Sequence, residues 1–324
     1  MAIHRLEELS WGELRRLGHE GALFLVPIGP MEDHGPHLPC GVDWFLAREF
    51  SQAIARRITY RDARREVVIA PGIPVGTSMM HQLGCLRVPM STTRSLIEAL
   101  GNELDNHGVR KAVVLTCHGA ISHLAAIQSA CSRVSARRRI DLYSPSHDMI
   151  ARFLSGGYRA SIERVLGRKF SDEEWKRLSS DFHAGAWETA FMLKFRPDLV
   201  KDFYRELPPH PWREGSLAMV SGLGTHRGYF GSPALASREL GEAAAQVLVD
   251  QSAALIQSFL EREPGVRPGR WTGAALLAGI GLLAGVGAAL YGRSRRRSEA
   301  PAPAEPPGLT ELAPNGARRA RRPV

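Results

Sequence analysis

Short runs of apolar residues alternate along the chain with longer stretches in which apolar residues recur at helical spacing. Four runs are too short for helices and are typical of buried strands, at 22–27, 66–70, 111–117 and 140–143. Stretches that predict helices lie at 43–58, 92–107, from about 122, 185–195 and 237–261. Strands that alternate with helices indicate βαβ units, so we expect an α/β fold: a mostly parallel sheet with helices on both faces.

Beyond the last predicted helix, the chain contains a long segment without charged residues. Residues 271–291 contain no charged residue and no proline. A helix of this length spans ~31 Å, about the thickness of a bilayer core. Trp271 and Tyr291 stand at its ends, where aromatic rings favour the membrane interface. We therefore expect one transmembrane helix here, joined by a linker at 263–270 to a folded domain at 1–262.

The formal net charge of +9 would ordinarily suggest a nucleic acid or an anionic membrane as partner. Residues 292–324 hold eight arginines against three glutamates, a net +5, which leaves +4 for the rest of the chain. This Pro- and Arg-rich tail is expected to be disordered. No aromatic residues interleave with the arginines, and 137–139 is expected to be a solvated helix end, so no nucleic-acid partner is predicted.

The two ends of the chain give opposing indications of where the domain at 1–262 would lie. The N-terminal segment has no apolar signal-peptide core, which favours a cytoplasmic domain held by a single C-terminal membrane anchor. The basic tail favours the opposite orientation, because positive residues prefer the cytoplasmic side. Four cysteines without a Cys-x-x-Cys pair indicate neither a disulfide framework nor a zinc ribbon.

Acidic residues and histidines gather in a Pro- and Gly-rich loop directly after the 22–27 strand. Glu32 and His34 are two residues apart, so in extended backbone they point to the same side. Asp43 begins the next helix and can return to the same point. Carboxylate and imidazole ligands suit zinc, manganese or iron, and the two oxygens of one carboxylate can bridge two metals. Ligands bind at the carboxyl ends of parallel strands, so the sequence predicts a metal site at this loop.

Two later segments carry further candidates. His118 follows the 111–117 strand and could reach the same edge of the sheet, although a lone histidine there is more often structural. His183 and Glu188 are five residues apart across an Ala-Gly entry into a helix. A helix N-terminus favours developing negative charge, but this segment is a weak indication when taken by itself.

Together these segments resemble the creatininase (creatinine amidohydrolase) family. The family pattern is Glu-x-His-Gly-Pro-His-Leu-Pro with an aspartate nine residues after the first histidine, and it matches at 32–39 and Asp43. The resemblance covers roughly residues 1–260 in unbroken order. Further matches lie at 71–78, His118, 183–189 and 228–233.

The resemblance implies a compact α/β domain that hydrolyses a C–N amide bond with a divalent metal, often two, with zinc expected and manganese or iron as alternatives. Asp43 would bridge the metals. His183 would be the catalytic residue, donating a proton to the leaving nitrogen or stabilising the oxyanion, and Ser78 would contact a small amide substrate. A homo-oligomer, a hexamer built from dimers, is also implied. The implied metal ligands are Glu32, His34, Asp43, His118 and Glu188.

Several departures bear on the substrate and on activity. Creatinine-hydrolysing members have a glutamate where Ala120 stands, so a cyclic amide, formamide or peptide-like substrate is expected instead of creatinine. Thr116 and Ile121 stand where asparagine is usual, and Asp33 where glutamine is usual. These positions affect hydrogen bonding around metal ligands. They leave open the alternative of a catalytically weakened, membrane-anchored binding or scaffold module.

Overall fold

A computed structural model describes residues 3–78, 80, 84–211 and 227–262. The predicted linker, transmembrane helix and basic tail (263–324) lie outside the described residues. Within the ranges that are described, the helices lack the length and apolar character needed to cross a membrane.

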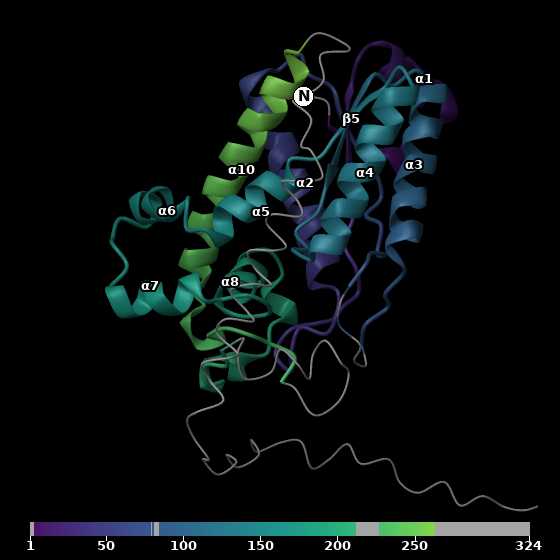
Figure 1. The fold of residues 1–324 in the computed structure, drawn as a ribbon. Coiled ribbons are helices and arrows are strands. Elements are labelled where there is room, and N and C mark those ends of the chain that lie inside the picture. The colour runs from purple at the N-terminus through teal and green to yellow at the C-terminus, as the bar shows by residue number, and fades with distance from the viewer. Residues whose placement is uncertain (1–2, 79, 81–83, 212–226, 263–324) are drawn as a thin grey trace, which may run out of the picture. The chain divides into compact units, whose positions relative to one another are not determined.

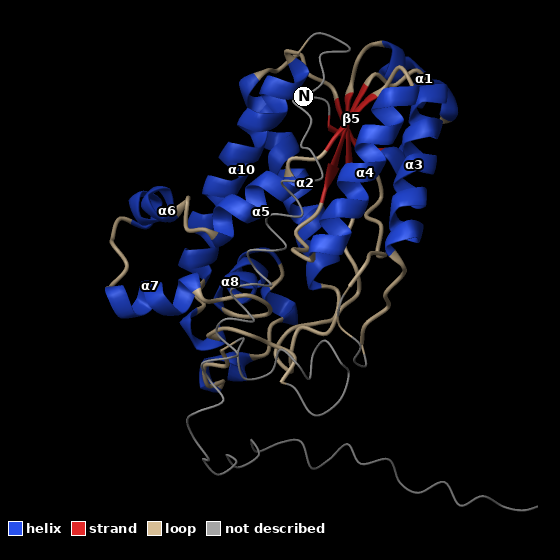
Figure 2. Ribbon diagram, in the orientation of Figure 1, coloured by secondary structure: helices blue, strands red, loops and turns tan. Residues whose placement is uncertain are grey.

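The centre of the fold is a five-stranded sheet in which every neighbouring pair is parallel, in the order β1-β3-β2-β4-β5. Figure 2 shows the strands as one layer between helices. Four strands lie where the apolar runs predicted them, which confirms the parallel α/β fold; β1, an edge strand of three residues, was missed. The strands are β1 (Ile3–Arg5), β2 (Leu23–Pro27), β3 (Val67–Ile69), β4 (Lys111–Leu115) and β5 (Asp141–Tyr143).

Helices cover both faces of the sheet, as the alternation of side chains along β2 requires. Leu23 and Leu25 belong to one apolar core, and Phe24 and Val26 to the other. Figure 1 shows α2 and α10 on one side of the sheet and α3 and α4 on the other. The first core is packed by α2 (Val42–Arg61), α8 (Ala186–Phe195) and α10 (Arg238–Leu260). The second is packed by α1 (Trp11–His19), α3 (Met90–Asn106) and α4 (Ile121–Arg137).

Other helices were not predicted. The polar region 155–180 forms two short helices, and a third short helix, which the apolar pattern also missed, precedes it. Several 3₁₀ turns complete the chain. The three helices are α5 (Ser146–Leu154), α6 (Arg159–Leu166) and α7 (Asp172–Ser179), and the 3₁₀ turns are η1 (Leu6–Glu8), η2 (Pro197–Leu199), η3 (Asp202–Glu206) and η4 (Pro233–Leu235). The arginines at 137–139 are exposed at the end of α4, as predicted.

The entry into α2 differs from the prediction. Asp43 was expected to begin the helix, but Gly41 is the N-cap and Asp43 lies buried within the first turn. The loop after β2 packs directly on this turn at Gly29. A Cβ atom at Gly29 would lie 2.5 Å from the Asp43 carbonyl carbon and 2.7 Å from the Trp44 nitrogen. The absence of a side chain at Gly29 therefore lets the strand end and the helix start meet, which carries Asp43 to the loop that holds Glu32.

Candidate metal centre

The predicted ligands converge at the carboxyl ends of two adjacent strands. β2 pairs with β4; the loop after β2 carries Glu32 and His34, and His118 stands three residues beyond β4. Asp43 comes from the first turn of α2, and Glu188 from the first turn of α8. The structure thus brings together side chains that are up to 156 positions apart in the sequence.

Asp43 lies between two groups of ligand atoms. His118 Nδ1 is 3.0 Å from Asp43 Oδ2 and 3.2 Å from Glu32 Oε2. On the other side, His34 Nε2 is 3.8 Å from Asp43 Oδ2 and 3.7 Å from Glu188 Oε2. The ligand atoms of Glu32, His34 and His183 lie within 4.8 Å of one another, and two further groups that meet this distance contain Asp43. The first group with Asp43 is Glu32, Asp43 and His118, and the second is His34, Asp43 and Glu188. A carboxylate that belongs to both groups has the position of a bridge between two cations.

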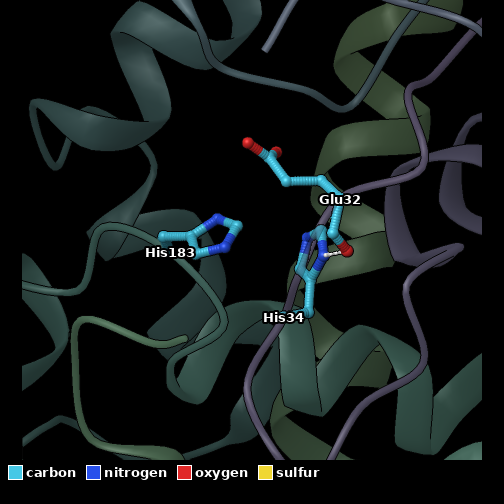
Figure 3. Close-up of side chains that lie close together, drawn as sticks. All are labelled: Glu32, His34 and His183. Atoms are coloured by element: carbon cyan, nitrogen blue, oxygen red, sulfur yellow. Dashed lines mark hydrogen bonds between the residues drawn. The ribbon is translucent and has the colours of Figure 1, made fainter. Parts of the chain in front are cut away.

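The two histidines are oriented by backbone carbonyls. His34 donates from Nδ1 to the Glu32 carbonyl at 2.9 Å, the dashed line in Figure 3. His118 donates from Nε2 to the Thr77 carbonyl at 3.2 Å. Each hydrogen bond fixes one ring nitrogen as the donor, so in the neutral ring the other nitrogen presents a lone pair to the carboxylates. Histidines that bind metals are oriented in the same way.

Several polar atoms of the cluster are buried without a hydrogen bond to any described residue: Glu32 Oε2, His34 Nε2 and both carboxylate oxygens of Asp43. Leaving polar or charged atoms unpaired in the interior costs free energy. A divalent cation in each group would satisfy these atoms. The donor set of imidazole nitrogens and carboxylate oxygens therefore fits zinc, manganese or iron.

The electrostatics of the cluster point the same way. Burial by itself would lower the pKa of His118, but the Glu32 and Asp43 carboxylates outweigh it and raise that pKa to about 10. Burial also lowers the pKa of His34, but the Asp43 and Glu188 carboxylates outweigh it, so that pKa is raised. Three carboxylates in a buried site create a field that favours positive charge, whether it is carried by a proton or by a metal ion.

His183 stands at the edge of the cluster and is half-buried. Its Nε2 donates to the Asp33 carbonyl at 2.7 Å, and its ring centroid is 4.4 Å from that of His34. Figure 3 shows both rings and the Glu32 carboxylate arranged around a common space. The backbone of His183 pairs with Phe230 through hydrogen bonds of 2.6 and 3.1 Å. His183 is thus fixed where a group bound at the cluster would meet it.

The family profile described as creatininase, creatinine amidohydrolase, matches residues 7–256. The chain belongs to the creatininase family. The creatinine amidohydrolase of Pseudomonas putida is 25% identical over 253 residues, covering 75% of this chain and 92% of the relative. A mycofactocin precursor peptide peptidase of Mycolicibacterium smegmatis is 26% identical over 242 residues, covering 70% of this chain and 81% of the relative. One of these relatives is thus named as an amidohydrolase and the other as a peptide peptidase.

Solved creatininases share the fold. A structure described as "Creatininase Mn" superposes with a TM-score of 0.62 at 22% identity, covering 80% of this chain and 99% of that one. A creatininase variant described as "Zn-Zn type" gives a TM-score of 0.60 at 22% identity, covering 80% and 98%. At this level of identity the likeness establishes the creatininase fold.

In this creatininase-family chain, the turn that carries His183 and Glu188 is held by a residue that the sequence analysis missed. The Asp181 carboxylate accepts hydrogen bonds from the Trp187 amide at 3.0 Å and the Ser232 amide at 2.9 Å. Burial raises the pKa of Asp181 to about 7, although those hydrogen bonds oppose the rise. Asp181 stands four residues before Gly185, the N-cap of α8, so no local capping pattern identifies it.

The residue after His183 adopts an unusual conformation. Ala184 has φ of +47°, a left-handed value that residues other than glycine rarely adopt. Its amide donates to Glu188 Oε2 at 2.5 Å. The turn therefore aims a backbone donor at Glu188 and presents His183 to the same space.

Ser78, predicted to contact the substrate, lies against the cluster. Its hydroxyl donates to Glu32 Oε1 and accepts from the Met80 amide, with an Oγ–N distance of 2.9 Å. Ser78 therefore orients the Glu32 carboxylate, and its contact with a substrate stays a prediction.

Two further histidines support the cluster from outside the ligand groups. His37 is buried with its Nε2 2.9 Å from the Thr189 hydroxyl, and burial together with His34 and His183 lowers its pKa to about 3. His123 is fully buried, accepts from the Thr77 amide at 3.2 Å and donates to the Thr116 hydroxyl at 3.2 Å. Thr116 in turn accepts from the His118 amide at 3.2 Å, so the residue that replaces the usual asparagine still fixes the turn that carries His118.

Proposed function

We propose that this protein is a dinuclear metal-dependent amidohydrolase. The observation that carries the proposal is the pair of buried ligand groups that share Asp43, with polar atoms left unsatisfied between them. The names of its relatives, an amidohydrolase and a peptide peptidase, support an amide C–N bond as the target.

Two divalent ions in these groups would supply Lewis acidity, which lowers the pKa of water and polarises an amide carbonyl. Zinc is the expected metal, with manganese or iron as alternatives; solved creatininases described with Mn and as Zn-Zn type support this choice. The chain contributes three carboxylates that offset the metal charge and two histidines that carbonyl hydrogen bonds hold in place.

His183 is the proposed catalytic residue. His183 Nε2 donates a hydrogen bond to the Asp33 carbonyl. Nδ1 is therefore the nitrogen that can take up a proton and release it to the leaving nitrogen of the amide. The backbone pairing with Phe230 holds the ring in one place during that transfer.

The test uses the full-length protein. Metal content is measured by mass spectrometry, and hydrolysis is measured over a panel of formamides, cyclic amides and short peptides. We expect about two metals per chain and amide hydrolysis, with His183→Gln lowering kcat about 10²- to 10⁴-fold at unchanged metal content. His19→Gln, an exposed histidine of α1, is the matched control. A wild-type protein without bound metal, or a His183→Gln variant with full kcat, would contradict the proposal.

The departures from the family pattern affect the substrate more than the metals. Ala120 lines the cavity beside the cluster and supplies no carboxylate, so we propose a substrate other than creatinine. The alternative of a catalytically weakened scaffold gains no support, because the five proposed ligands converge and Thr116 still hydrogen-bonds at the His118 turn.

We further propose that residues 271–291 anchor the chain in a membrane with the catalytic domain in the cytoplasm, and that the chain forms homo-oligomers. The support for the anchor is the uncharged 21-residue sequence between Arg270 and Arg293. We expect the full-length protein in the membrane fraction after alkaline washing, and release by the double substitution Leu277→Arg and Leu283→Arg. A wild-type chain found in the supernatant would contradict the anchor.

A further inference from the structure

A cavity of about 190 Å³ opens beside the cluster of proposed metal ligands. Glu32, His118, His183 and Glu188 line one end of it, so the cavity and the cluster form one continuous space. An apolar cavity of about 150 Å³ in another protein is large enough to bind benzene. This cavity can therefore hold more than the amide group itself.

The other walls of the cavity are apolar and come from four helices. Aromatic rings meet edge to face along them: the Phe50 and Phe191 centroids are 5.4 Å apart at 83°, and those of Phe153 and Trp187 are 4.9 Å apart at 73°. Residues that line these walls include Leu46 and Phe50 of α2, Met149 and Phe153 of α5, Phe191 of α8 and Leu248 of α10.

Charge is confined to the catalytic end. Among the described residues that line the cavity, the charged side chains belong to the cluster or to Asp181, and none is lysine or arginine. A charged substituent on the far side would be desolvated without a counter-ion, which is costly. The lining therefore selects for an uncharged group.

The exposed part of the cavity lining is apolar as well. Leu154 and Phe182 line the cavity, and they are 46% and 50% exposed. Both side chains are apolar, and part of the surface of each remains accessible to solvent. An apolar group would thus contact apolar surface from the outside to the far wall.

We propose that the substrate is an uncharged amide with a bulky apolar substituent, the size of a phenyl or branched alkyl group. That substituent fills the cavity while the amide lies at the metal cluster. The inference rests on the proposed function and adds the substrate class. Burying such a substituent should tighten binding on the order of 10- to 100-fold relative to a methyl group, from the transfer free energy of its apolar surface.

The test measures binding rather than turnover. Full-length protein is loaded with zinc, its metal content is determined, and hydroxamates are titrated by calorimetry. One series is enlarged on the acyl carbon, from acetohydroxamate to benzohydroxamate and 4-carboxybenzohydroxamate. A second series carries the same groups on the nitrogen of acetohydroxamate. In at least one of the two series, we expect the phenyl compound to bind at least 10-fold tighter than the methyl compound. The carboxyphenyl compound of that series is expected to lose this gain in affinity.

A variant that fills the cavity checks where the substituent lies. Ser252 of α10 is buried and lines the cavity, whereas Ser258 on the same helix is exposed. Ser252→Leu is expected to abolish the gain from the phenyl group. Ser258→Leu, the matched control, is expected to retain the gain.

The outcomes separate the two proposals. If zinc and acetohydroxamate bind but neither series gains affinity with size, the apolar-substrate inference is wrong and the proposed function stands. A gain that survives in Ser252→Leu also overturns the inference, because the substituent then lies elsewhere. If neither zinc nor acetohydroxamate binds to the wild-type protein, both proposals fail.

Discussion

Replacing Asp43 with alanine is expected to remove both metals and to lower kcat/KM by about 10⁴-fold or more, since Lewis acidity contributes several kcal/mol of transition-state stabilisation. Asp43 belongs to both ligand groups, and its Oδ2 lies 3.0 Å from His118 Nδ1 and 3.8 Å from His34 Nε2. Loss of this carboxylate leaves each group with one carboxylate and one imidazole, too few for a tight site.

Metal content after dialysis measures the effect, with circular dichroism as a check on folding. We expect about two metals per wild-type chain and close to none in Asp43→Ala. His118→Ala and Glu188→Ala each remove a ligand of one group and are expected to keep about one metal. Asp148→Ala, at an exposed aspartate of α5, serves as the control and should keep two. An Asp43→Ala protein that retains both metals would rule out the bridging role.

The parallel sheet was predictable because buried strands leave a local signal. Each apolar run that predicted a strand is one, with ends shifted by one or two residues. The three-residue strand β1 is too short to show a period, and α1 and α7 are polar on most positions. Their capping residues were the available signal: Ser10 and Glu13 form a capping box, and Ser171 caps α7.

The convergence of the proposed ligands was predictable for a different reason: chemically distinctive residues follow two strands, and their spacing matches the pattern of the creatininase family. What the sequence could not provide is the support around them. Asp181 reaches the Ser232 amide 51 positions away, and His37 meets Thr189 across 152 positions. Such pairs depend on the packing of α8 against the rest of the domain. The apolar cavity is likewise the space that four helices leave between them, so no single segment of the sequence determines its shape.

Gly29→Ala is expected to damage stability and metal binding together. A Cβ at position 29 would lie 2.5 to 2.7 Å from backbone atoms of Asp43 and Trp44, and the backbone of α2 can yield only by moving its first turn. Overpacking of this kind costs about 3 kcal/mol, which corresponds to a fall in Tm of about 6–12 °C for a domain of this size. The same displacement moves Asp43 away from Glu32 and His118.

The thermal midpoint and metal content of the full-length variant test this close contact. We expect Gly29→Ala to lose at least one of the two metals. Gly12→Ala is the control, because no atom lies within 4 Å of a Cβ at this exposed position of α1. Alanine favours the helix there by up to about 1 kcal/mol, so Tm should hold or rise slightly. If Gly29→Ala keeps both the wild-type Tm and two metals, then the meeting of strand end and helix start is not what places Asp43. If only the midpoint falls, the contact stabilises the fold without setting the position of the bridging carboxylate.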